Sequence, residues 1–586
     1  MILQALYSYY HALAQKGEIS KEGWCVAKVS FALVLDENGA LLDIMPLKVS
    51  KEFGKKAVDV PREMNLPNQL KRSGSKAPPY FLCDNTQYIL GLEKGEVTEK
   101  SLRCFKAFSE YHIQMLSSLQ CPEAQAIARF LRSWQPTEAL KHPVIIANQP
   151  HLLEGGNFVF RLSETSSYAQ DVPEIQECWN AQESDASKAV QGVCLVTGKR
   201  AAIARIHNSV KGIRTTSLSP NGWTLVGMDK EAFESYGKTQ SYNAPVCETA
   251  AFAYTTALSH LLSNRDHVRL LGDATVVYWA ENAEPMYQNV FDMELDASAK
   301  FSQDDLLRVM DAFSRGSSCD MDGVELSPET KFYILGLSPN SARLSVRFFY
   351  QNTFYNLLNN IEDHYKRLDI VRPSYEKFER LSISALLDET VNQKAKDKSA
   401  SPLLAGALLL AVLQNTPYPA ALYNSVMLRI RAEQKVTRGR AAIIKAVLFK
   451  KINISNEIKE VLIVKLNEQS TYVPYVLGRV FSLLESIQQA ANPGLNSTIK
   501  DRYFNSACAT PSVVFPLLLR LKNSHIRVLK REKSGLAIRY EKQLGSLMSG
   551  IEQTFPPHLN LDEQGTFILG YYHQTQKQYE KQNKED

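Results

Sequence analysis

The pattern of hydrophobic and polar positions changes near Leu381. Before this residue, short apolar runs with a two-residue period alternate with polar turns, whereas after it most apolar residues recur every three or four positions. A period of two places alternate side chains on one face of a strand, and the longer period places them on one face of a helix. We therefore predict an α+β fold, in which a mixed, β-rich N-terminal body is followed by an all-α helical-bundle C-terminal domain.

The boundary between these two regions is expected in the polar segment 391–402, which ends at a proline. We accordingly assign residues 1–395 to the α+β body and residues 396–586 to the helical domain. A chain of this length is expected to form roughly two to four domains, each with a core of its own.

The body is expected to begin with a helix over residues 1–16 and a β-hairpin over residues 29–47. The hairpin prediction depends on Asn38-Gly39, because this dipeptide favours the tight turn between antiparallel strands. The patterns further predict a polar exposed loop over 61–79, a strand–turn–strand unit over 80–92, helices over 98–118 and 122–133, a β-rich stretch over 143–226, a helix over 251–264, strands over 269–280 and 332–339, and a strand that turns into a helix over 343–368.

The C-terminal domain has the helical period, and Pro, Gly and Asn residues separate its segments. We predict helices over 402–414, 420–434, 438–450, 454–467, 474–491, 512–533 and 537–553.

Basic residues are concentrated in the last quarter of the chain. Residues 427–586 contain 24 Lys and Arg against 14 Asp and Glu, whereas the whole chain contains 67 against 62. Clustered cations bind polyanions by releasing counterions, although a solvated helical surface produces the same bias. The charge favours a nucleic-acid-binding face without requiring one.

Motifs of common enzymes and metal sites are missing from the sequence. Gly237-Lys238-Thr239 resembles the end of a phosphate-binding loop, but Ala232 occupies the position of its first glycine. There is no G-x-S-x-G elbow, no H-E-x-x-H pair, and no C-x-x-C pair among nine cysteines. We therefore expect no enzymatic activity, no metal and no cofactor.

The chain is expected to stay in the reducing cytoplasm. Its N-terminus has no basic leader, and its longest apolar run, 403–413, is too short to cross a membrane.

Long and unusual stretches of the sequence indicate a family. They begin with MILQALYSYYHALAQKG and VSFALVLDENGALLDIMPL, and they continue as KRSGSKAPPYFLCDNTQYILGL, CLVTGKRAAIARIH, SYNAPVCETAAFAYTTALSHLL, ILGLSPNSARLSVRFFY, VTRGRAAIIKAVL and GRVFSLLESIQQAANPGLNSTIKDRYFNSACATPSVVFPLLLR. In this order, to about residue 530, they resemble the Csd-type large subunit of the type I-C CRISPR interference complex, Cascade.

The resemblance implies a role in DNA recognition. Such large subunits lie beside the backbone and crRNA-processing subunits of a crRNA-bearing complex. They read the short protospacer-adjacent motif (PAM) on double-stranded target DNA and help to unwind it. They also hold the displaced strand of the R-loop and help to recruit a separate helicase–nuclease. Guide pairing reads the target sequence in such systems, while protein reads the PAM.

The resemblance also implies a small subunit that is made from an internal start. Met427 is the only methionine between Met321 and Met548, and it opens the basic last quarter. We therefore expect residues 427–586, or a product from a nearby codon, to be made separately as that small subunit.

The polar loop is the first candidate for reading the PAM. Lys71 and Arg72 would meet phosphates, Asn68 or Gln69 would reach base edges, and Lys76 would add a further cation. The loop could instead simply join strands or pack on a neighbouring subunit.

The Gly155-Gly156-Asn157 turn is the second candidate, because glycine lets a backbone come close to a ligand. The same structural alternative applies to it. For the displaced strand, we expect backbone contacts from the cations Lys199, Arg200, Arg438, Lys445, Lys450, Arg527, Lys530 and Arg531.

Two other functions compete with PAM recognition. The chain could be a purely architectural subunit whose basic face binds crRNA or neighbouring subunits. It could also be a metal-dependent nuclease, but the sequence shows no cluster of carboxylates or histidines for that chemistry.

Overall fold

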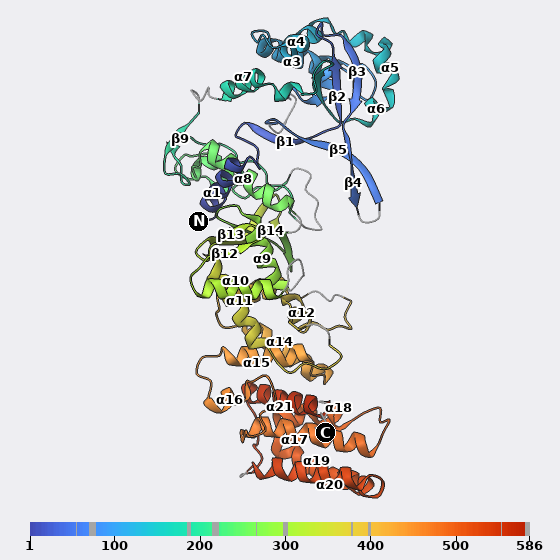
Figure 1. Cartoon of the computed structure of the whole chain (residues 1–586), viewed down its shortest axis with the longest axis vertical. Coiled ribbons are helices and arrows are strands. Elements are labelled where there is room, and N and C mark those ends of the chain that lie inside the picture. The colour runs from blue at the N-terminus through green and yellow to red at the C-terminus, as the bar shows by residue number, and fades with distance from the viewer. Residues whose placement is uncertain are drawn as a thin grey trace. The chain divides into compact units, whose positions relative to one another are not determined.

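The computed structural model (Figure 1) describes residues 1–53, 56–69, 78–183, 189–213, 222–264, 267–296, 303–376, 379–396, 400–551 and 554–579. The chain forms two compact units. Unit 1 comprises mainly Leu3–Asn208 and Val226–Leu258, and unit 2 comprises mainly Ser209–Leu225 and the chain from Ser259 onward. Strands concentrate in the N-terminal half and helices dominate the C-terminal region, which confirms the predicted α+β class.

One sheet of unit 1 has the strand order β3-β2-β7-β6. Its strands are β2 (Phe31–Leu35), β3 (Leu41–Pro46), β6 (Asp84–Asn85) and β7 (Asn157–Leu162). β2 and β3 are antiparallel, which confirms the predicted hairpin, and Gly39 turns between them with φ of 83°. A Cβ added at Gly39 would lie 2.5 Å from the backbone nitrogen of Phe130 in α4 (Pro122–Ser133). Only glycine therefore fits this turn.

The second sheet of unit 1 has the order β1-β5-β4, with β1 (Trp24–Val29), β5 (Lys56–Pro67) and β4 (Lys48–Phe53). β5 pairs with β1 from Pro67 back to Arg62 and with β4 from Pro61 back to Lys56. Because proline has no N–H, Pro61 is tolerated where the strand changes its partner. The predicted loop over 61–79 is therefore strand as far as Pro67. β4 and the first half of β5 form a two-stranded arm (Figure 1).

Helices replace strands at two further places in unit 1. The segment 80–92 contains only the short β6 before α2 (Thr86–Ile89), because the Asn85 side chain accepts from the backbone N–H of Gln87 and caps a helix. Pro143 begins α5 (Pro143–Ala147) in the stretch predicted to be β-rich. The remaining elements are α1 (Ile2–Lys16), α3 (Glu99–Leu116), α6 (Gln149–Glu154), α7 (Pro173–Glu183), β8 (Gln191–Val193), β9 (Arg200–Ala202) and α8 (Glu248–Ser263).

Unit 2 contains an antiparallel sheet with the order β10-β11-β14-β15. The predicted strand over 269–280 is a hairpin, because Gly272 turns the chain with φ of 63°. Tyr278, Phe291, Phe332 and Phe354 pack in a row, with ring centroids 4.9–5.3 Å apart. The elements are β10 (Val268–Leu271), β11 (Ala274–Ala280), α9 (Pro285–Asp296), α10 (Gln303–Ser314), β12 (Cys319–Met321), β13 (Val324–Leu326), β14 (Lys331–Asn340), β15 (Arg343–Thr353) and α11 (Phe354–Leu368).

The rest of unit 2 is helical. All seven predicted helices are present, although the one predicted over 454–467 is shortened to α16, and α12, α18 and α21 were not predicted. The helices are α12 (Ile383–Asp388), α13 (Pro402–Leu413), α14 (Ala420–Glu433), α15 (Arg438–Phe449), α16 (Asn456–Val461), α17 (Val473–Ala491), α18 (Ile499–Ala509), α19 (Pro511–Glu532), α20 (Ser534–Ser549) and α21 (Leu561–Tyr579).

α17 and α21 pack closely at two glycines. A Cβ added at Gly478 would lie 1.9 Å from the carbonyl oxygen of Phe567, and one added at Gly570 would lie 2.1 Å from that of Tyr475. α21 is buried along most of its length, from Gln564 to Gln574. Glycine lowers helix propensity but lets two backbones approach, so packing decides the structure of α21.

One apolar core runs through unit 2 from Val276 to Tyr572. The compact units divide near residue 258, and the boundary that the sequence suggests over 391–402 lies between residues of this single core. That boundary stays a prediction about how the chain is divided. Across the described residues, no helix has the length and apolar character that a membrane span requires.

Candidate nucleic-acid interface

Asn68 and Gln69 lie directly after β5. The backbone N–H of Asn68 donates to the carbonyl of Gly23 at 2.8 Å, which fixes the start of the loop beside β1. The Gln69 Nε2 is shielded from solvent and has no hydrogen-bond partner among the described residues. A buried amide donor without a partner is costly, so this group is available to an acceptor beyond those residues. Lys71, Arg72 and Lys76 lie outside the described residues.

The Gly155-Gly156-Asn157 turn lies between α6 and β7. A Cβ added at Gly156 would lie 2.2 Å from the Ser30 Oγ, so packing within the chain already requires this glycine. The Asn157 side chain donates to the carbonyl of Lys28 at 3.2 Å. Gly155 is exposed, with φ of 73° and no atom within 4 Å of an added Cβ, so it is the part of the turn that another backbone can approach.

The two PAM candidates lie at opposite ends of β1. Asn68 is bonded beside Gly23, before the strand, whereas Asn157 is bonded to Lys28 near its end. Five residues at about 3.3 Å each separate these points by roughly 16 Å. The structure therefore does not bring the two PAM candidates together at one place on unit 1.

Lys199 and Arg200 are exposed at the turn between β8 and β9. The turn is fixed by the Cys194 Sγ, which accepts from the backbone N–H groups of Val196 at 3.4 Å and Cys247 at 3.3 Å. Burial raises the pKa of the Cys194 thiol, but these N–H groups and Thr197 outweigh that effect and lower it to about 7. No ion pair holds Lys199 or Arg200 among the described residues.

Lys445 and Lys450 are not on the open helical side that the sequence suggests. Lys445 is only 3% exposed, and its Nζ donates to the carbonyls of Arg367 at 3.0 Å and Asp369 at 2.8 Å. The Lys450 Nζ donates to the carbonyl of Asn415 at 2.6 Å. α15 is covered by α11 and α21, which is why Lys445 is turned onto carbonyls of the same chain.

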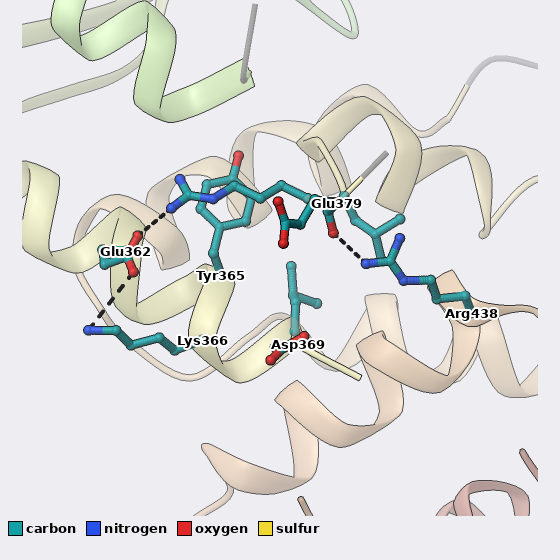
Figure 2. A pocket seen from close by; sticks show the side chains of 9 residues that line it. Glu362, Tyr365, Lys366, Asp369, Glu379 and Arg438 are labelled. Atoms are coloured by element: carbon teal, nitrogen blue, oxygen red, sulfur yellow. Dashed lines mark hydrogen bonds and ion pairs between the residues drawn. The ribbon is translucent and has the colours of Figure 1, made fainter. Parts of the chain in front are cut away.

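Arg438 is likewise buried, at 5% exposure, beside a cavity of about 190 Å³ (Figure 2). Its guanidinium pairs with Glu376 at 3.2 Å and donates to the carbonyl of Glu379. On the other side of the cavity, Arg380 pairs with Glu362 at 2.7 Å. The lining residues are Glu362, Tyr365, Lys366, Leu368, Asp369, Glu379, Arg380, Leu381 and Arg438.

The charges of this cavity compensate one another. Glu362 also faces Lys366 at 4.0 Å (Figure 2). The Arg380 guanidinium lies 4.6 Å from the centre of the Tyr365 ring. Each cation that lines the cavity thus has a carboxylate or carbonyl partner in the chain. Because these cations are paired within unit 2, the arrangement leaves little positive charge for a phosphate.

Arg527, Lys530 and Arg531 are exposed on α19, in contrast to the cations of α15. Lys530 pairs with Glu541 at 2.9 Å, whereas Arg527 and Arg531 have no ion pair within the described part of the chain. α20 packs against α19 and adds the exposed cations Arg539 and Lys542, which sequence reasoning missed. The positions of Arg539 and Lys542 in the sequence do not show that α20 packs back against α19.

Comparison with known families decides the identity. A family model described as CRISPR-associated protein (Cas_Csd1) matches residues 6–579. The chain belongs to this family. It is a Csd-type large subunit of a type I-C Cascade complex and functions together with other Cas subunits. The curated proteins include no match to the chain.

Proposed function

We propose that this Cascade large subunit recognises the PAM on double-stranded target DNA, assists its unwinding, holds the displaced strand, and helps to recruit a separate helicase–nuclease. It would do so in the cytoplasm, beside the backbone and crRNA-processing subunits and the crRNA. The observation that carries the proposal is that this family member has, on both units, exposed cations for which the described residues provide no ion pair. These cations are Lys199 and Arg200 in unit 1, and Arg527 and Arg531 in unit 2.

The groups that each unit leaves available to DNA determine which part of the DNA we expect it to contact. Gln69, whose amide donor has no partner among the described residues, and Gly155, with its open backbone, are groups of unit 1 suited to base edges and close approach. The cations of α19 suit the phosphates of a single strand. Arg438, Lys445 and Lys450 would have to break contacts within the chain to meet DNA, so we give them no place in the strand-binding surface of the full-length subunit.

The test measures the affinity of the purified Cascade complex for two guide-matched duplexes that differ only in the PAM. We expect tighter binding of the duplex with the PAM, and weaker binding of both duplexes when Lys71 and Arg72 are changed to Ala. A complex that binds both duplexes equally would contradict PAM recognition and leave the architectural function.

The proposed small subunit would begin inside a helix. Met427 lies within α14 and is 2% exposed, so a product that starts there lacks the first half of that helix. It also lacks the groups at 367, 369 and 376 that hold Lys445 and Arg438. Intact-mass analysis of the complex should find a second product that begins near residue 427; full-length chain alone would contradict this proposal.

A further inference from the structure

A tyrosine in unit 1 is held fully in solvent at the tip of a tight turn. The turn comprises Ser235–Lys238, in which the backbone N–H of Lys238 donates to the carbonyl of Ser235 at 3.0 Å. Tyr236 has φ of 54° and Gly237 has φ of 68°, and two successive positive values are the mark of a type I′ turn. The Tyr236 side chain is 100% exposed.

This conformation is unfavourable for tyrosine. A positive φ suits Gly, Asn or Asp, and for other residues it costs about 1 kcal/mol or more. An exposed aromatic ring gains nothing from packing in the chain, so neither the backbone nor the side chain of Tyr236 benefits the fold. Such a residue is best explained by a contact that the chain makes with another molecule.

The turn is rigidly supported from below. The Asn243 side chain accepts from the N–H of Ser235 at 2.9 Å and donates to the carbonyls of Lys238 at 2.7 Å and Gln240 at 2.9 Å. The Gln240 side chain in turn accepts from Arg205 at 2.7 Å. The backbone of a turn that is already fixed loses little conformational entropy on binding.

The same turn contains the motif that resembles a phosphate-binding loop. Gly237-Lys238-Thr239 is followed by a short 3-10 helix over Gln240–Asn243 and not by the α-helix that such loops require. Gly237 allows the tight turn, and this segment exposes the Tyr236 ring instead of binding a phosphate.

The surroundings of the ring indicate a flat partner. Ser235, Gly237, Lys238 and Thr239 are all exposed and small or polar. Aromatic anchors in protein interfaces are surrounded by contacts that exclude water, which these neighbours do not offer. A nucleobase needs only the face of one ring, and such stacking is tolerant of sequence.

We propose that Tyr236 stacks on an exposed nucleobase of the target DNA, at the end of a duplex that is being opened or in the released strand. This inference rests on the proposed function. Lys230 and Lys238 belong to the same exposed segment, but Asp229 and Glu231 offset their charge. Stacking, and not attraction to phosphates, would therefore supply the affinity.

The test uses the intact Cascade complex and guide-matched duplexes that carry 5-iodouracil at one position at a time. This base crosslinks under ultraviolet light to an aromatic ring stacked on it. We expect the crosslinked peptide to contain Tyr236 for positions beside the PAM. Absence of that crosslink at every position would overturn the inference.

Affinity measurements on variants provide the second readout. Tyr236→Ala should weaken binding about tenfold with an unchanged salt dependence, whereas Tyr236→Phe should retain it. Tyr375→Ala removes another tyrosine that is 81% exposed and should have no effect. Equal binding by Tyr236→Ala and the unchanged complex would count against stacking.

Further outcomes distinguish a protein partner from DNA, and a failure of the proposed function from a failure of this inference. If a photoreactive residue at position 236 crosslinks to another subunit and not to DNA, the partner of this position is a protein and the inference is overturned. A complex with no PAM preference whose Tyr236 still crosslinks would overturn the proposed function and retain the stacking contact.

Discussion

Lys445 carries its charge inside unit 2, where two backbone carbonyls replace water. Burial lowers its pKa to about 8, although Asp369 opposes the shift. A lysine spaced along a helix looks like a surface residue in the sequence, because the spacing does not show which neighbours cover the helix. In this chain, α11 and α21 cover α15 from parts of the sequence that are far away. Local sequence patterns therefore could not predict that Lys445 is buried.

The stability of the chain should depend on the protonation of Lys445. Its pKa in the folded chain, about 8, is below the 10.5 of an unperturbed lysine, so the unfolded chain binds more protons between these pH values. Stability contributed by this group is complete above about pH 10.5 and is lost as the pH falls through about 8, by at most roughly 3 kcal/mol.

Urea unfolding across about pH 7 to 10 tests this dependence. Lys445→Met should remove the rise in unfolding free energy that the unchanged chain shows with increasing pH. Lys459→Met, at an exposed position of α16, should keep it. The same rise in both variants would show that Lys445 does not titrate in this range.

The contact between α17 and α21 shows how an element can escape detection in the sequence. Two glycines and apolar residues on all sides give α21 no clear helical period, and both features result from its central position. The hairpin of β2 and β3 was predictable because Asn38-Gly39 and alternating residues are local signals. Local signals thus identified most of the elements, and packing between distant segments determined the others.

Gly570→Ala should destabilise unit 2. The added Cβ would meet the Tyr475 carbonyl oxygen at 2.1 Å, so α17 and α21 would have to move apart, at a cost of about 2 kcal/mol or more. Gly545→Ala is the matched control, because α20 leaves open space at that position and alanine favours a helix by up to about 1 kcal/mol. The midpoint of thermal unfolding should be higher for Gly545→Ala than for Gly570→Ala. Equal midpoints would mean that α17 and α21 adjust without cost.

In the folded chain, some basic residues of the last quarter are buried and others are exposed. The sequence correctly indicates an excess of cations there, but it cannot separate those that are buried in the core from those that remain in solvent. α15 turns its cations inward, whereas α19 and α20 leave theirs exposed. The candidate PAM loop illustrates the same limit, because Lys71 and Arg72 lie outside the described residues and their contacts stay a prediction.

Charge reversal on α19 should affect the late stage of DNA capture. Arg527→Glu with Arg531→Glu should slow completion of the R-loop more than initial PAM binding, and alanine at both sites should reduce the salt slope by about one to two. Lys106→Glu with Lys141→Glu reverses two cations of unit 1 that are each 77% exposed and should change neither step. A larger effect on initial binding than on R-loop completion would contradict a role in holding the displaced strand.

The position of α21 in the chain has a consequence for how the protein is made. The ribosome synthesises α17 well before α21, with α18, α19 and α20 in between. Until residues up to Tyr579 have emerged, the surface of α17 that α21 covers stays open, and the core of unit 2 is incomplete. Folding of this region is therefore expected to finish late in translation, and the growing chain exposes apolar surface to chaperones or to aggregation until then.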